Sequence, residues 1–375
     1  MKKIALIGST GSIGRQVLNV VRKNPEDFEV FSMSCGNNIK LFAEQIKEFH
    51  PKIATSAVEL PERIYGTEYF FGENAFLHAI VKDVDLVVVS LVGFLGLYAV
   101  IEAIKKKKNI SLANKESLVV GGEFVTEQAN KSGVEIYPID SEHSAVWQAL
   151  SFDKNKEFKR IILTASGGAL RDYTKEMLKT ATAKDALLHP NWDMGDKITV
   201  DCATLVNKGF EVIEAKWLYN ASFDKIDVII HRESIIHSMV EYNDGSVIAQ
   251  MSYPSMELPI EIALSYPERK ISGLKSLDFV KIGKLTFEKT DNERFPCLNL
   301  VISAGKAGGL YPAVVNGANE QAVKLFLEQK IKYNDIYAGL DFALSSFSDN
   351  TKPSLDSVIV ADAFGRNAVK KLFGE

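Results

Sequence analysis

The sequence predicts an α/β protein: a doubly wound parallel sheet, then an α+β domain, then a small C-terminal α-helical domain. Near-continuous apolar runs such as 4–7 and 86–89 alternate with amphipathic stretches, which is typical of parallel strands covered by helices. Alternating runs around a turn signal at 243–245 indicate antiparallel strands in the middle of the chain. Helical periodicity after Pro296 indicates the last domain.

Composition limits the kind of protein. The chain has 375 residues, with 44 basic and 48 acidic side chains and a formal net charge of -4, which excludes a protein that binds nucleic acid through excess positive charge. Three cysteines, Cys35, Cys202 and Cys297, lie far apart and indicate neither a disulfide framework nor a zinc site. The first apolar run ends at Gly8, too early for a signal peptide or membrane span. We therefore expect a cytoplasmic protein with no membrane partner.

The first domain is expected over residues 1–139. Its strands are predicted at 4–7, 28–33, 86–89 and 134–139, and a helix is predicted at 13–22.

The second domain is expected over residues 140–264. Strands are predicted at 160–164, 228–230, 234–240 and 247–252, and the last three are expected to form an antiparallel meander.

The rest of the chain is expected to be a linker arm followed by helices. Turn residues and lysines accumulate in 265–292, which indicates a connecting arm. In the C-terminal domain, 293–375, helices are predicted at 319–329, 337–347 and 361–373.

A glycine-rich loop follows the first strand directly. Gly8, Gly11 and Gly14 are spaced by three, an arrangement that lets the backbone turn tightly and present helix N-terminal N–H groups to a pyrophosphate. A plain strand-to-helix loop is the alternative. The position of the motif at the start of a βαβ unit favours a Rossmann-like dinucleotide site.

The end of the second strand bears on the choice of dinucleotide. The residues Gly36, Asn37 and Asn38 include no acid to bind a ribose 2′-hydroxyl, which favours NADP over NAD. No Arg or Lys precedes Lys40 to pair with a 2′-phosphate.

Two acids lie where a strand is expected to end and a helix to begin. Asp140 and Glu142 are two positions apart, and alternate side chains of an extended segment share a face, so the pair could hold one cation. Both acids could equally complement a helix dipole, and the local pattern does not decide between the two interpretations.

A third acid lies on a predicted helix. Asn207, Lys208 and Glu211 fall on one helical face, a set that suits an anionic substrate beside a metal. An amphipathic helix capped by Asn207, with Glu211 in solvent, is the alternative. If the three acids converge, all-oxygen ligation selects Mg²⁺ or Mn²⁺.

Two loops carry further candidates. The strand at 160–164 leads into Ser166 and two glycines, which could receive a phosphate or form a simple turn. The segment 189–195 contains Trp192 and shows neither helical nor strand periodicity, as in a lid that excludes water; a Trp packed in the core is the alternative.

His231 and His237 fit no metal spacing, and we expect both to be structural.

Together these segments resemble the 1-deoxy-D-xylulose 5-phosphate reductoisomerase family over essentially the whole chain. The resemblance rests on the following segments, in this order: 8–14, 113–117, 140–143, 166–168, 189–195, 207–211 and 295–298. Several motifs in the right order are far more specific than any one of them.

The resemblance implies an NADPH- and divalent-metal-dependent enzyme of non-mevalonate isoprenoid biosynthesis. It would isomerise and reduce 1-deoxy-D-xylulose 5-phosphate, a phosphorylated sugar, to 2-C-methyl-D-erythritol 4-phosphate. The resemblance also implies a homodimer whose contact is made by the sheet of the middle domain.

Site residues are implied at matching positions. The implied cofactor contacts are Thr10, Gly11, Ser12, Ile13, Gly36, Asn37, Asn38, Asn114, Glu116 and Gly195. The implied ligands of Mg²⁺ or Mn²⁺ are Asp140, Glu142 and Glu211. The implied substrate contacts are Lys115, Ser141, Glu142, Ser166, His189, Trp192, Cys202, Asn207, Lys208 and Glu211. Of these, Lys115, His189 and the metal ligands are expected to be catalytic.

Three departures from the family pattern stand out. Cys202 replaces a phosphate-contacting serine, and a thiol is a weaker donor. Asn37 replaces a basic residue that is common at this position, which bears on the preference for NADP over NAD. Ala169 and Leu170 replace Pro-Phe, and we expect only a local packing change there.

Two other functions compete with this interpretation. Another NADP-dependent dehydrogenase, such as a semialdehyde dehydrogenase, needs a nucleophilic cysteine with a base partner, and no cysteine here lies in a matching context. A non-catalytic dinucleotide sensor would not need three acids. Neither alternative predicts consumption of NADPH with deoxyxylulose phosphate and Mg²⁺.

Overall fold

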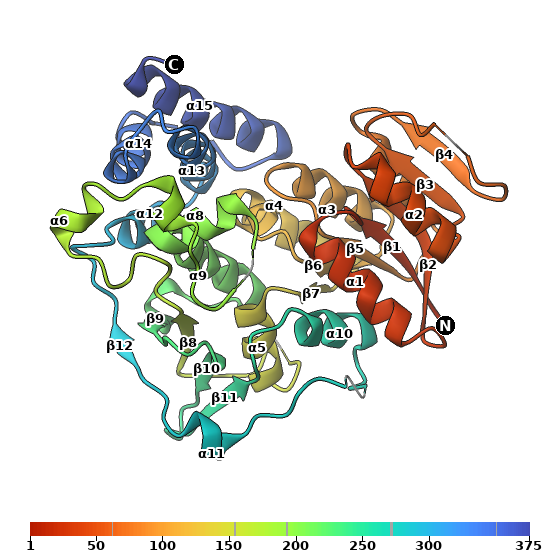
Figure 1. The fold of residues 1–375 in the computed structure, drawn as a ribbon, viewed down its shortest axis with the longest axis horizontal. Helices are drawn as coiled ribbons and strands as arrows, with labels where there is room; N and C mark the ends of the chain where they lie inside the picture. The colour runs from red at the N-terminus through yellow and green to blue at the C-terminus, as the bar shows by residue number, and fades with distance from the viewer. Residues whose placement is uncertain (62, 154, 193, 271–272, 350) are drawn as a thin grey trace. The chain divides into compact units, whose positions relative to one another are not determined.

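The computed structural model describes residues 1–375 except 62, 154, 193, 271–272 and 350 (Figure 1). The chain forms two compact units. The first unit consists of Met1–Ser117, Val125–Ser144 and Ser255–Leu274, and the second of Leu118–Phe124, Ala145–Pro254 and Lys275–Glu375. The four expected segments, 1–139, 140–264, 265–292 and 293–375, stay a prediction. The division into compact units does not test the role expected for each segment.

The first unit is built on a sheet with the strand order β4-β3-β2-β1-β5-β6-β7. The strands are β1 (Lys2–Ile7), β2 (Phe28–Cys35), β3 (Ile53–Ser56), β4 (Glu68–Phe71), β5 (Leu86–Val89), β6 (Asn109–Leu112) and β7 (Ile136–Pro138). All neighbouring strands are parallel, which confirms the predicted doubly wound sheet. The chain changes direction across the sheet between β1 and β5, and such a switch point binds ligands at the carboxyl ends of the strands.

The central strands are apolar on both faces. Every residue of Ile4–Ile7 and of β5 is buried, as expected for parallel strands in the interior of a sheet. The helices of this part of the chain are α1 (Ser12–Lys23), α2 (Ile39–Phe49), η1 (Ala75–Ala79), α3 (Leu95–Lys105), α4 (Glu116–Ser132) and α10 (Glu257–Ser265). Helix α10 packs against α1 and β7 although it comes late in the sequence.

Three strands of this sheet were not predicted. β3, β4 and β6 have four residues each, and polar residues such as Thr55 and Ser111 interrupt their apolar pattern although both are fully buried. Ser111 is accommodated because its hydroxyl donates to the Ala263 carbonyl at 3.2 Å. β7 is shorter than the strand predicted at 134–139.

The sheet of the second unit corrects the predicted meander. Its strands are β8 (Arg160–Ala165), β9 (Ile226–Ile230), β10 (Ile236–Glu241), β11 (Val247–Met251) and β12 (Glu288–Lys289), in the order β11-β10-β8-β9-β12. The β10–β11 hairpin is antiparallel as predicted. Placing β9 beside β10 was wrong, because β8 lies between them, parallel to β9 and antiparallel to β10.

The remaining helices include a C-terminal helical bundle, which confirms the predicted third part of the fold. These helices are α5 (Ser141–Ala149), α6 (Lys175–Leu178), α7 (Ala183–Ala186), α8 (Asp196–Thr204), α9 (Val206–Tyr219), η2 (Phe223–Lys225), α11 (Phe279–Ile282), α12 (Cys297–Ala307), α13 (Tyr311–Leu327), α14 (Tyr333–Ser345) and α15 (Leu355–Phe373). Helix α13 packs against α12, α14 and α15 (Figure 1). Helices α13, α14 and α15 each begin earlier than predicted.

The early part of α13 explains part of that difference. Asn316, Gly317 and Asn319 are buried there and break the apolar period. A Cβ on Gly317 would lie 2.0 Å from the Asp362 carbonyl oxygen, so glycine permits the close approach of α15.

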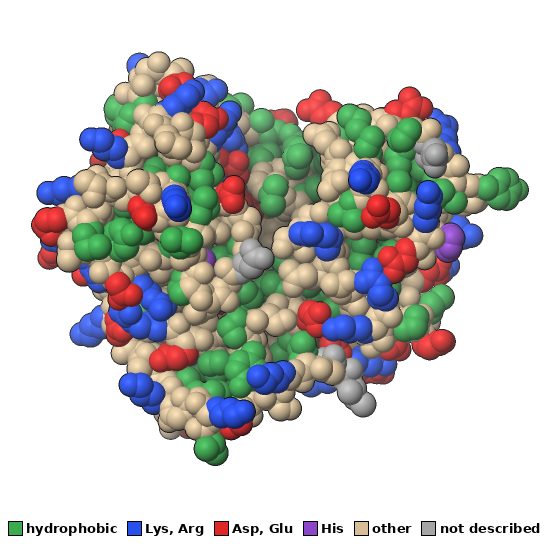
Figure 2. All heavy atoms as spheres, viewed as in Figure 1, with side chains coloured by type: hydrophobic (Ala, Val, Ile, Leu, Met, Phe, Trp, Pro, Cys, Tyr) green, Lys and Arg blue, Asp and Glu red, His purple; other side chains and the backbone are tan. Residues whose placement is uncertain are grey.

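Charged side chains of both signs lie intermixed on the face drawn in Figure 2. Within the described residues, none of the helices combines the length and the hydropathy that a membrane crossing requires.

Candidate functional site

The glycine-rich loop leaves β1 at the switch point of the parallel sheet. Gly8 has a φ of 98°, a conformation that glycine adopts without steric cost, and its N–H donates to Ser34 Oγ at 2.9 Å. A Cβ on Gly14 would lie 2.2 Å from the Gly8 carbonyl oxygen. Glycine at position 14 therefore lets α1 start directly against the loop.

The N-terminus of α1 is suited to an anion. Gly11 caps the helix without a side-chain hydrogen bond, and the first turn contains no acidic residue. The N–H groups of a first helical turn have no intrahelical acceptor and carry the positive end of the dipole. The expected cofactor residues Thr10 to Ile13 thus lie where a pyrophosphate binds in such folds.

The loop after β2 forms a second part of this edge. Gly36, Asn37 and Asn38 are exposed. Asn38 Oδ1 accepts the N–H of Leu41 at 3.4 Å and caps α2. The side chain of Asn37 has no such structural task among the hydrogen bonds of the described residues.

Asn114 shapes the loop after β6. Its Nδ2 donates to the carbonyls of Leu91 and Gly93 at 3.0 and 2.9 Å and to Glu116 Oε2 at 3.0 Å. Its Oδ1 accepts the N–H of Ser117 at 3.1 Å. Both Asn114 and Glu116 therefore hold the loop at the carboxyl edge of the sheet, and their contact with a cofactor stays a prediction.

Lys115 and Asp140 form a buried ion pair. Lys115 Nζ lies 2.6 Å from Asp140 Oδ2, with side-chain exposures of 8% and 10%. Burial acts to raise the pKa of Asp140, but the Lys115 ammonium and His143 outweigh it and hold that pKa below its usual range. Asp140 is therefore a carboxylate at neutral pH, the form that binds metals.

The local geometry of Asp140 and Glu142 differs from the extended segment we assumed. Helix α5 begins at Ser141, so Glu142 lies in a first helical turn. The Glu142 N–H donates to Asp140 Oδ1 at 3.3 Å, and the Ser141 hydroxyl donates to the Glu142 carboxylate. The argument from a shared strand face was wrong. A helix N-terminus holds the two acids instead, where negative charge is favourable.

In the second unit, Asn207, Lys208 and Glu211 share one face of α9, as predicted. Asn207 Nδ2 donates to Glu211 Oε1 at 2.5 Å, and the Lys208 ammonium donates to the other carboxylate oxygen. Glu211 is only 1% exposed, which excludes the alternative of a solvated carboxylate. Leu205, with a φ of 62°, separates α8 from α9 and sets where this face begins.

Ser166 and His189 are hydrogen-bonded to each other. Ser166 Oγ lies 2.9 Å from His189 Nε2, and His189 Nδ1 accepts the N–H groups of Asn191 and Trp192 at 3.2 and 3.0 Å. Nδ1 is therefore unprotonated, and Nε2 carries the proton and donates it to Ser166. Burial, followed by the charge of Arg171, lowers the pKa of His189 to about 4, so the ring is neutral.

The Ser166 hydroxyl is left with its own hydrogen to donate. Its oxygen accepts from His189 and from the N–H of Gly168 at 3.1 Å. A hydroxyl with both lone pairs engaged offers an O–H, which suits a phosphate oxygen.

Sequence reasoning missed Arg171. Its Nη1 donates to the Ser166 carbonyl at 2.9 Å and to the Arg232 carbonyl at 3.4 Å. The available signal was an arginine one short loop after the Ser-Gly-Gly turn. Arg171 holds the Ser166 loop to the end of β9 and keeps a positive charge beside His189.

The expected lid segment is irregular, as predicted. Trp192 is half-buried, with its ring centroid 6.2 Å from that of His237, and Gly195 is the N-cap of α8. Asp193 lies outside the described residues. Cys202 is half-buried on α8.

His231 has a structural role, as expected. Nε2 accepts the N–H groups of Ile235 and Ile236 at 3.1 Å each, and Nδ1 lies 2.9 Å from the Thr286 carbonyl oxygen. His237 Nε2 lies 2.9 Å from Ser252 Oγ.

Each unit thus gathers its own share of the candidates. In the first unit, the expected cofactor residues other than Gly195 and the segments 115–116 and 140–142 follow the carboxyl ends of parallel strands. Gly195 lies in the second unit, at the start of α8. In the second unit, Ser166 meets His189, and Glu211 meets Asn207 and Lys208.

Three family models match the chain. The 1-deoxy-D-xylulose 5-phosphate reductoisomerase model matches residues 4–122. Its C-terminal domain model matches 136–219, and a second DXP reductoisomerase C-terminal domain model matches 251–368. The chain belongs to the 1-deoxy-D-xylulose 5-phosphate reductoisomerase family.

Curated reductoisomerases are similar over their whole length. The chain is 47% identical to 1-deoxy-D-xylulose 5-phosphate reductoisomerase 1 of Bacillus thuringiensis subsp. konkukian, covering 99% of this chain and 98% of that protein. It is also 47% identical to the reductoisomerase of Caldanaerobacter subterraneus subsp. tengcongensis, covering 100% of both.

Solved reductoisomerase structures share the fold. The Zymomonas mobilis enzyme in complex with NADPH has a TM-score of 0.93 and 36% identity, covering 99% of each chain. A DOX-P reductoisomerase in complex with NADPH, fosmidomycin and magnesium has a TM-score of 0.93 and 34% identity, covering 100% of this chain and 98% of that chain.

Proposed function

We propose that this chain is an NADPH- and divalent-metal-dependent oxidoreductase that converts 1-deoxy-D-xylulose 5-phosphate to 2-C-methyl-D-erythritol 4-phosphate in isoprenoid biosynthesis. The observation that carries the proposal is the end-to-end match to reductoisomerases. The glycine-rich loop at the switch point of a parallel sheet supports it independently.

NADPH would bind at the carboxyl edge of the parallel sheet. The first turn of α1 would receive the pyrophosphate, because its N–H groups are uncapped by any side chain. Gly36, Asn37 and Asn38 would contact the adenosine end, where a 2′-phosphate distinguishes NADPH from NADH. Asn114, Glu116 and Gly195 would complete the contacts.

The residues present fit a divalent cation. We assign Asp140, Glu142 and Glu211 as its ligands, because carboxylate oxygens suit Mg²⁺ or Mn²⁺. Within the first unit, Asp140 and Glu142 lie together at the start of α5; within the second, Glu211 is a buried acid on α9. Lys115 orients the Asp140 carboxylate and Lys208 orients that of Glu211 through their ion pairs.

The phosphate of the substrate would lie against Ser166, His189, Asn207 and Lys208. Ser166 contributes a free O–H, His189 fixes that hydroxyl through its Nε2–H, and Lys208 contributes a positive charge. Trp192 would cover this end and exclude water, and Cys202 would offer only a weak thiol donor.

When bound, the cation supplies Lewis-acid stabilisation of a developing oxyanion, and NADPH supplies hydride. The chain supplies the arrangement. Lys115 and Ser141, beside the acid pair, would contact the carbonyl and hydroxyl end of the substrate. Ser166 and His189 would hold the phosphate, so that binding energy at that end orients the reacting carbons.

One assay tests the function. The purified protein is mixed with 1-deoxy-D-xylulose 5-phosphate, Mg²⁺ and either NADPH or NADH, with and without chelator, and the fall in nicotinamide absorbance is followed. We expect oxidation of NADPH that requires both substrate and metal. Absence of substrate-dependent oxidation would leave a different dehydrogenase or a dinucleotide sensor as the better description.

Two of the three cysteines weigh against a semialdehyde dehydrogenase. Burial raises the pKa of Cys35 to about 12, and burial followed by the charge of Asp201 raises that of Cys297 to about 12. Reactive cysteines need the opposite shift, because the thiolate is the nucleophile.

Three finer points stay proposals: a homodimer formed through the middle-domain sheet, use of Mn²⁺ beside Mg²⁺, and a cytoplasmic location.

A further inference from the structure

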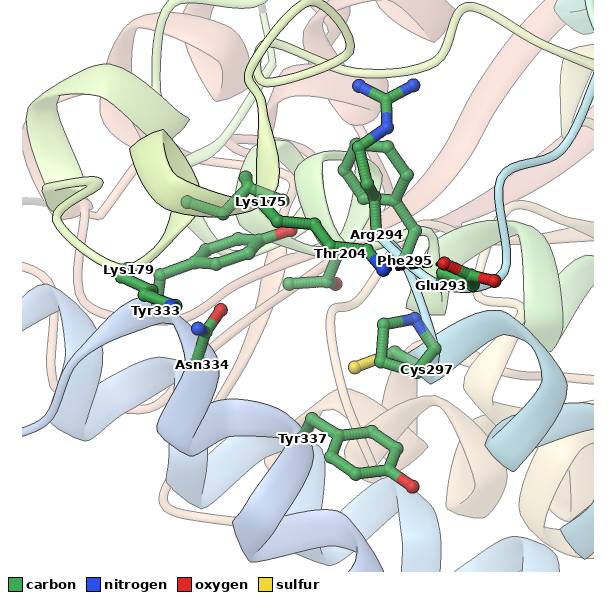
Figure 3. Close-up of a pocket in the computed structure, with 12 residues that line it drawn as sticks. Lys175, Lys179, Thr204, Glu293, Arg294, Phe295, Cys297, Tyr333, Asn334 and Tyr337 are labelled. Atoms are coloured by element: carbon green, nitrogen blue, oxygen red, sulfur yellow. Dashed lines mark hydrogen bonds and ion pairs between the residues drawn. The ribbon is translucent and has the colours of Figure 1, made fainter.

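A cavity of about 300 Å³ lies within the second unit, and none of the residues that line it belongs to the candidate active site (Figure 3). One wall is formed by Phe295–Pro296–Cys297 at the start of α12. The opposite wall is formed by Tyr333 and Tyr337 of α14, and Lys175 and Lys179 lie at the α6 side. The volume is at the lower end of the range for small-molecule sites.

The walls of the cavity suit an apolar group. Tyr333 and Tyr337 are one helical turn apart and present two rings on the same side of α14. Phe295 and Cys297 are each 5% exposed, and burial raises the pKa of the Cys297 thiol to about 12, so this wall is uncharged. A ring or a short alkyl chain would replace water there favourably.

The rim of the cavity suits an anion. Lys175 Nζ lies 2.5 Å from Glu293 Oε2, and Figure 3 shows the two side chains directed toward one another. The Lys179 ammonium, by contrast, makes no ion pair or hydrogen bond within the described chain. An apolar wall beside this lysine is complementary to an anionic group on an apolar body.

We propose that this cavity binds a small amphipathic anion, with a carboxylate, phosphate or sulfonate head and an aromatic or short aliphatic body, and that its occupancy lowers the affinity for the phosphorylated substrate. The regulatory half of the proposal rests on the proposed function.

Hydrogen bonds link the cavity to the Ser166 loop. Arg294 lines the cavity, but its guanidinium extends away from it (Figure 3) and donates to the carbonyls of Arg171 and Tyr173 at 2.9 and 2.8 Å. Arg171 in turn donates to the Ser166 carbonyl at 2.9 Å. A ligand that displaces the wall 293–297 therefore pulls on the segment that positions Ser166.

A second connection runs through α8. Thr204 also lines the cavity, and its Oγ1 accepts the N–H of Val206 at 3.4 Å. Asn207 and Lys208 follow immediately on α9. Both connections end at residues assigned to the phosphate, so occupancy is expected to change the substrate KM and leave the KM for NADPH unchanged.

The test uses 8-anilinonaphthalene-1-sulfonate, an aromatic anion whose fluorescence rises in apolar surroundings. Its binding is titrated against the wild-type chain and the variants Lys179→Glu, Tyr337→Ala and Lys184→Glu. Lys184→Glu is the matched control, because it makes the same charge change on the exposed surface of α7, away from the cavity. Thermal unfolding checks that each variant is folded.

We expect saturable binding to the wild type and to Lys184→Glu, and binding weaker by roughly fivefold or more in Lys179→Glu and Tyr337→Ala. The dye should raise the substrate KM of the wild type and of Lys184→Glu. It should leave the substrate KM of Lys179→Glu and Tyr337→Ala unchanged. Equal affinity for the dye in all four proteins would overturn the site.

Normal turnover with dye-insensitive KM in every protein would overturn the regulation while the proposed function stands. Absence of turnover in all proteins would instead contradict the proposed function, and the titrations would still decide whether the cavity binds the anion.

Discussion

Glu211 is a buried carboxylate whose charge has a specific purpose. A carboxylate with 1% exposure is costly to bury without partners, and Lys208 and Asn207 supply them. A hydrophobic residue would fill the same space at lower cost. The acid is therefore best explained by a ligand that needs a negative charge.

Glu211→Gln tests this explanation. The amide removes the charge and keeps the size, so we expect NADPH binding to be nearly unchanged and turnover to fall by about 100-fold or more through weaker metal binding. Calorimetric titration with Mn²⁺ measures the metal, and NADPH fluorescence measures the cofactor. Glu328→Gln, on an exposed residue, is the control. Full turnover of Glu211→Gln would remove this residue from the ligand set.

The stability of the folded chain at acid pH is expected to depend on the protonation of the His189 imidazole. Its pKa is about 4 in the folded chain against an ordinary value of 6.5, so between these values the unfolded chain binds the proton more readily. Stability is then fully present above about pH 6.5 and is lost as pH falls toward 4.

His189→Gln is expected to reduce that loss, because the amide retains a donor for Ser166 and does not titrate. The measurement is the difference in Tm between pH 7 and pH 5 in the wild type and the variant. The same difference in both proteins would show that His189 is not the group responsible.

Replacement of Cys202 by serine is expected to strengthen binding of the substrate. A serine hydroxyl is a stronger donor than a thiol, and a hydrogen bond to a charged group contributes about 1.5–3 kcal/mol. If Cys202 faces the substrate phosphate, Cys202→Ser should lower the substrate KM by roughly tenfold. The KM for NADPH is the internal control, since it should not change, and an unchanged substrate KM would place Cys202 away from the phosphate.

At the scale of elements, the start of α1 depends on close approach to β1. Gly14→Ala would place a Cβ 2.2 Å from a backbone oxygen, so α1 must move. We expect a loss of about 1–3 kcal/mol in stability and NADPH binding weaker by roughly tenfold or more. Denaturant unfolding and NADPH titration measure the two effects.

Gly339→Ala is the matched control for this prediction. The nearest atoms to its Cβ lie at 3.4 Å on side chains, and alanine favours helix by about 1 kcal/mol. If Gly14→Ala binds NADPH as well as Gly339→Ala does, the close approach is not required.

The elements that were predictable from the sequence are those with an uninterrupted pattern. β1 and β5 are wholly apolar where they cross the core, and β10–β11 is marked by a turn at Gly245, whose φ is 87°. β3 and β6 escaped prediction because Thr55 and Ser111 are buried despite their polarity. No local pattern could place β8 between β9 and β10, since that order is decided by long-range pairing.

The candidate site was predictable in its residue types and less so in its geometry. The segment from Asp140 was expected to be extended because a strand precedes it. In the structure Asp140 caps α5, and Glu142 lies in the first turn of that helix. Arg171 was missed because an arginine that donates to backbone carbonyls is marked in the sequence only by its place after the Ser-Gly-Gly turn. The face of Asn207, Lys208 and Glu211 was predicted correctly because helical spacing alone defines it.

At the scale of the whole molecule, each unit is assembled from separated parts of the chain. Residues 255–274 join the first unit, where Lys2 Nζ donates to the Leu264 carbonyl at 2.7 Å and α10 packs against α1. Such contacts join residues far apart in the sequence, so neither composition nor periodicity could predict them.

The proposed association of two chains can be tested at the edge of the sheet in the second unit. β11 is an edge strand of its sheet, and it exposes Val247 and Ile248 at 48% and 45%. Exposed apolar residues on an unpaired edge favour pairing with another chain. We therefore expect a homodimer that buries this strand, with twice the mass of the 41.5 kDa chain.

Ile248→Lys should convert the dimer to a monomer, because it places a charge in the buried contact, and light scattering after size-exclusion chromatography measures the change. Val360→Lys, at an exposed position of α15, makes a comparable change elsewhere and should leave the dimer intact. A dimer that tolerates both substitutions must use another surface, and a wild type that is monomeric at all concentrations would show that the edge of β11 stays in solvent.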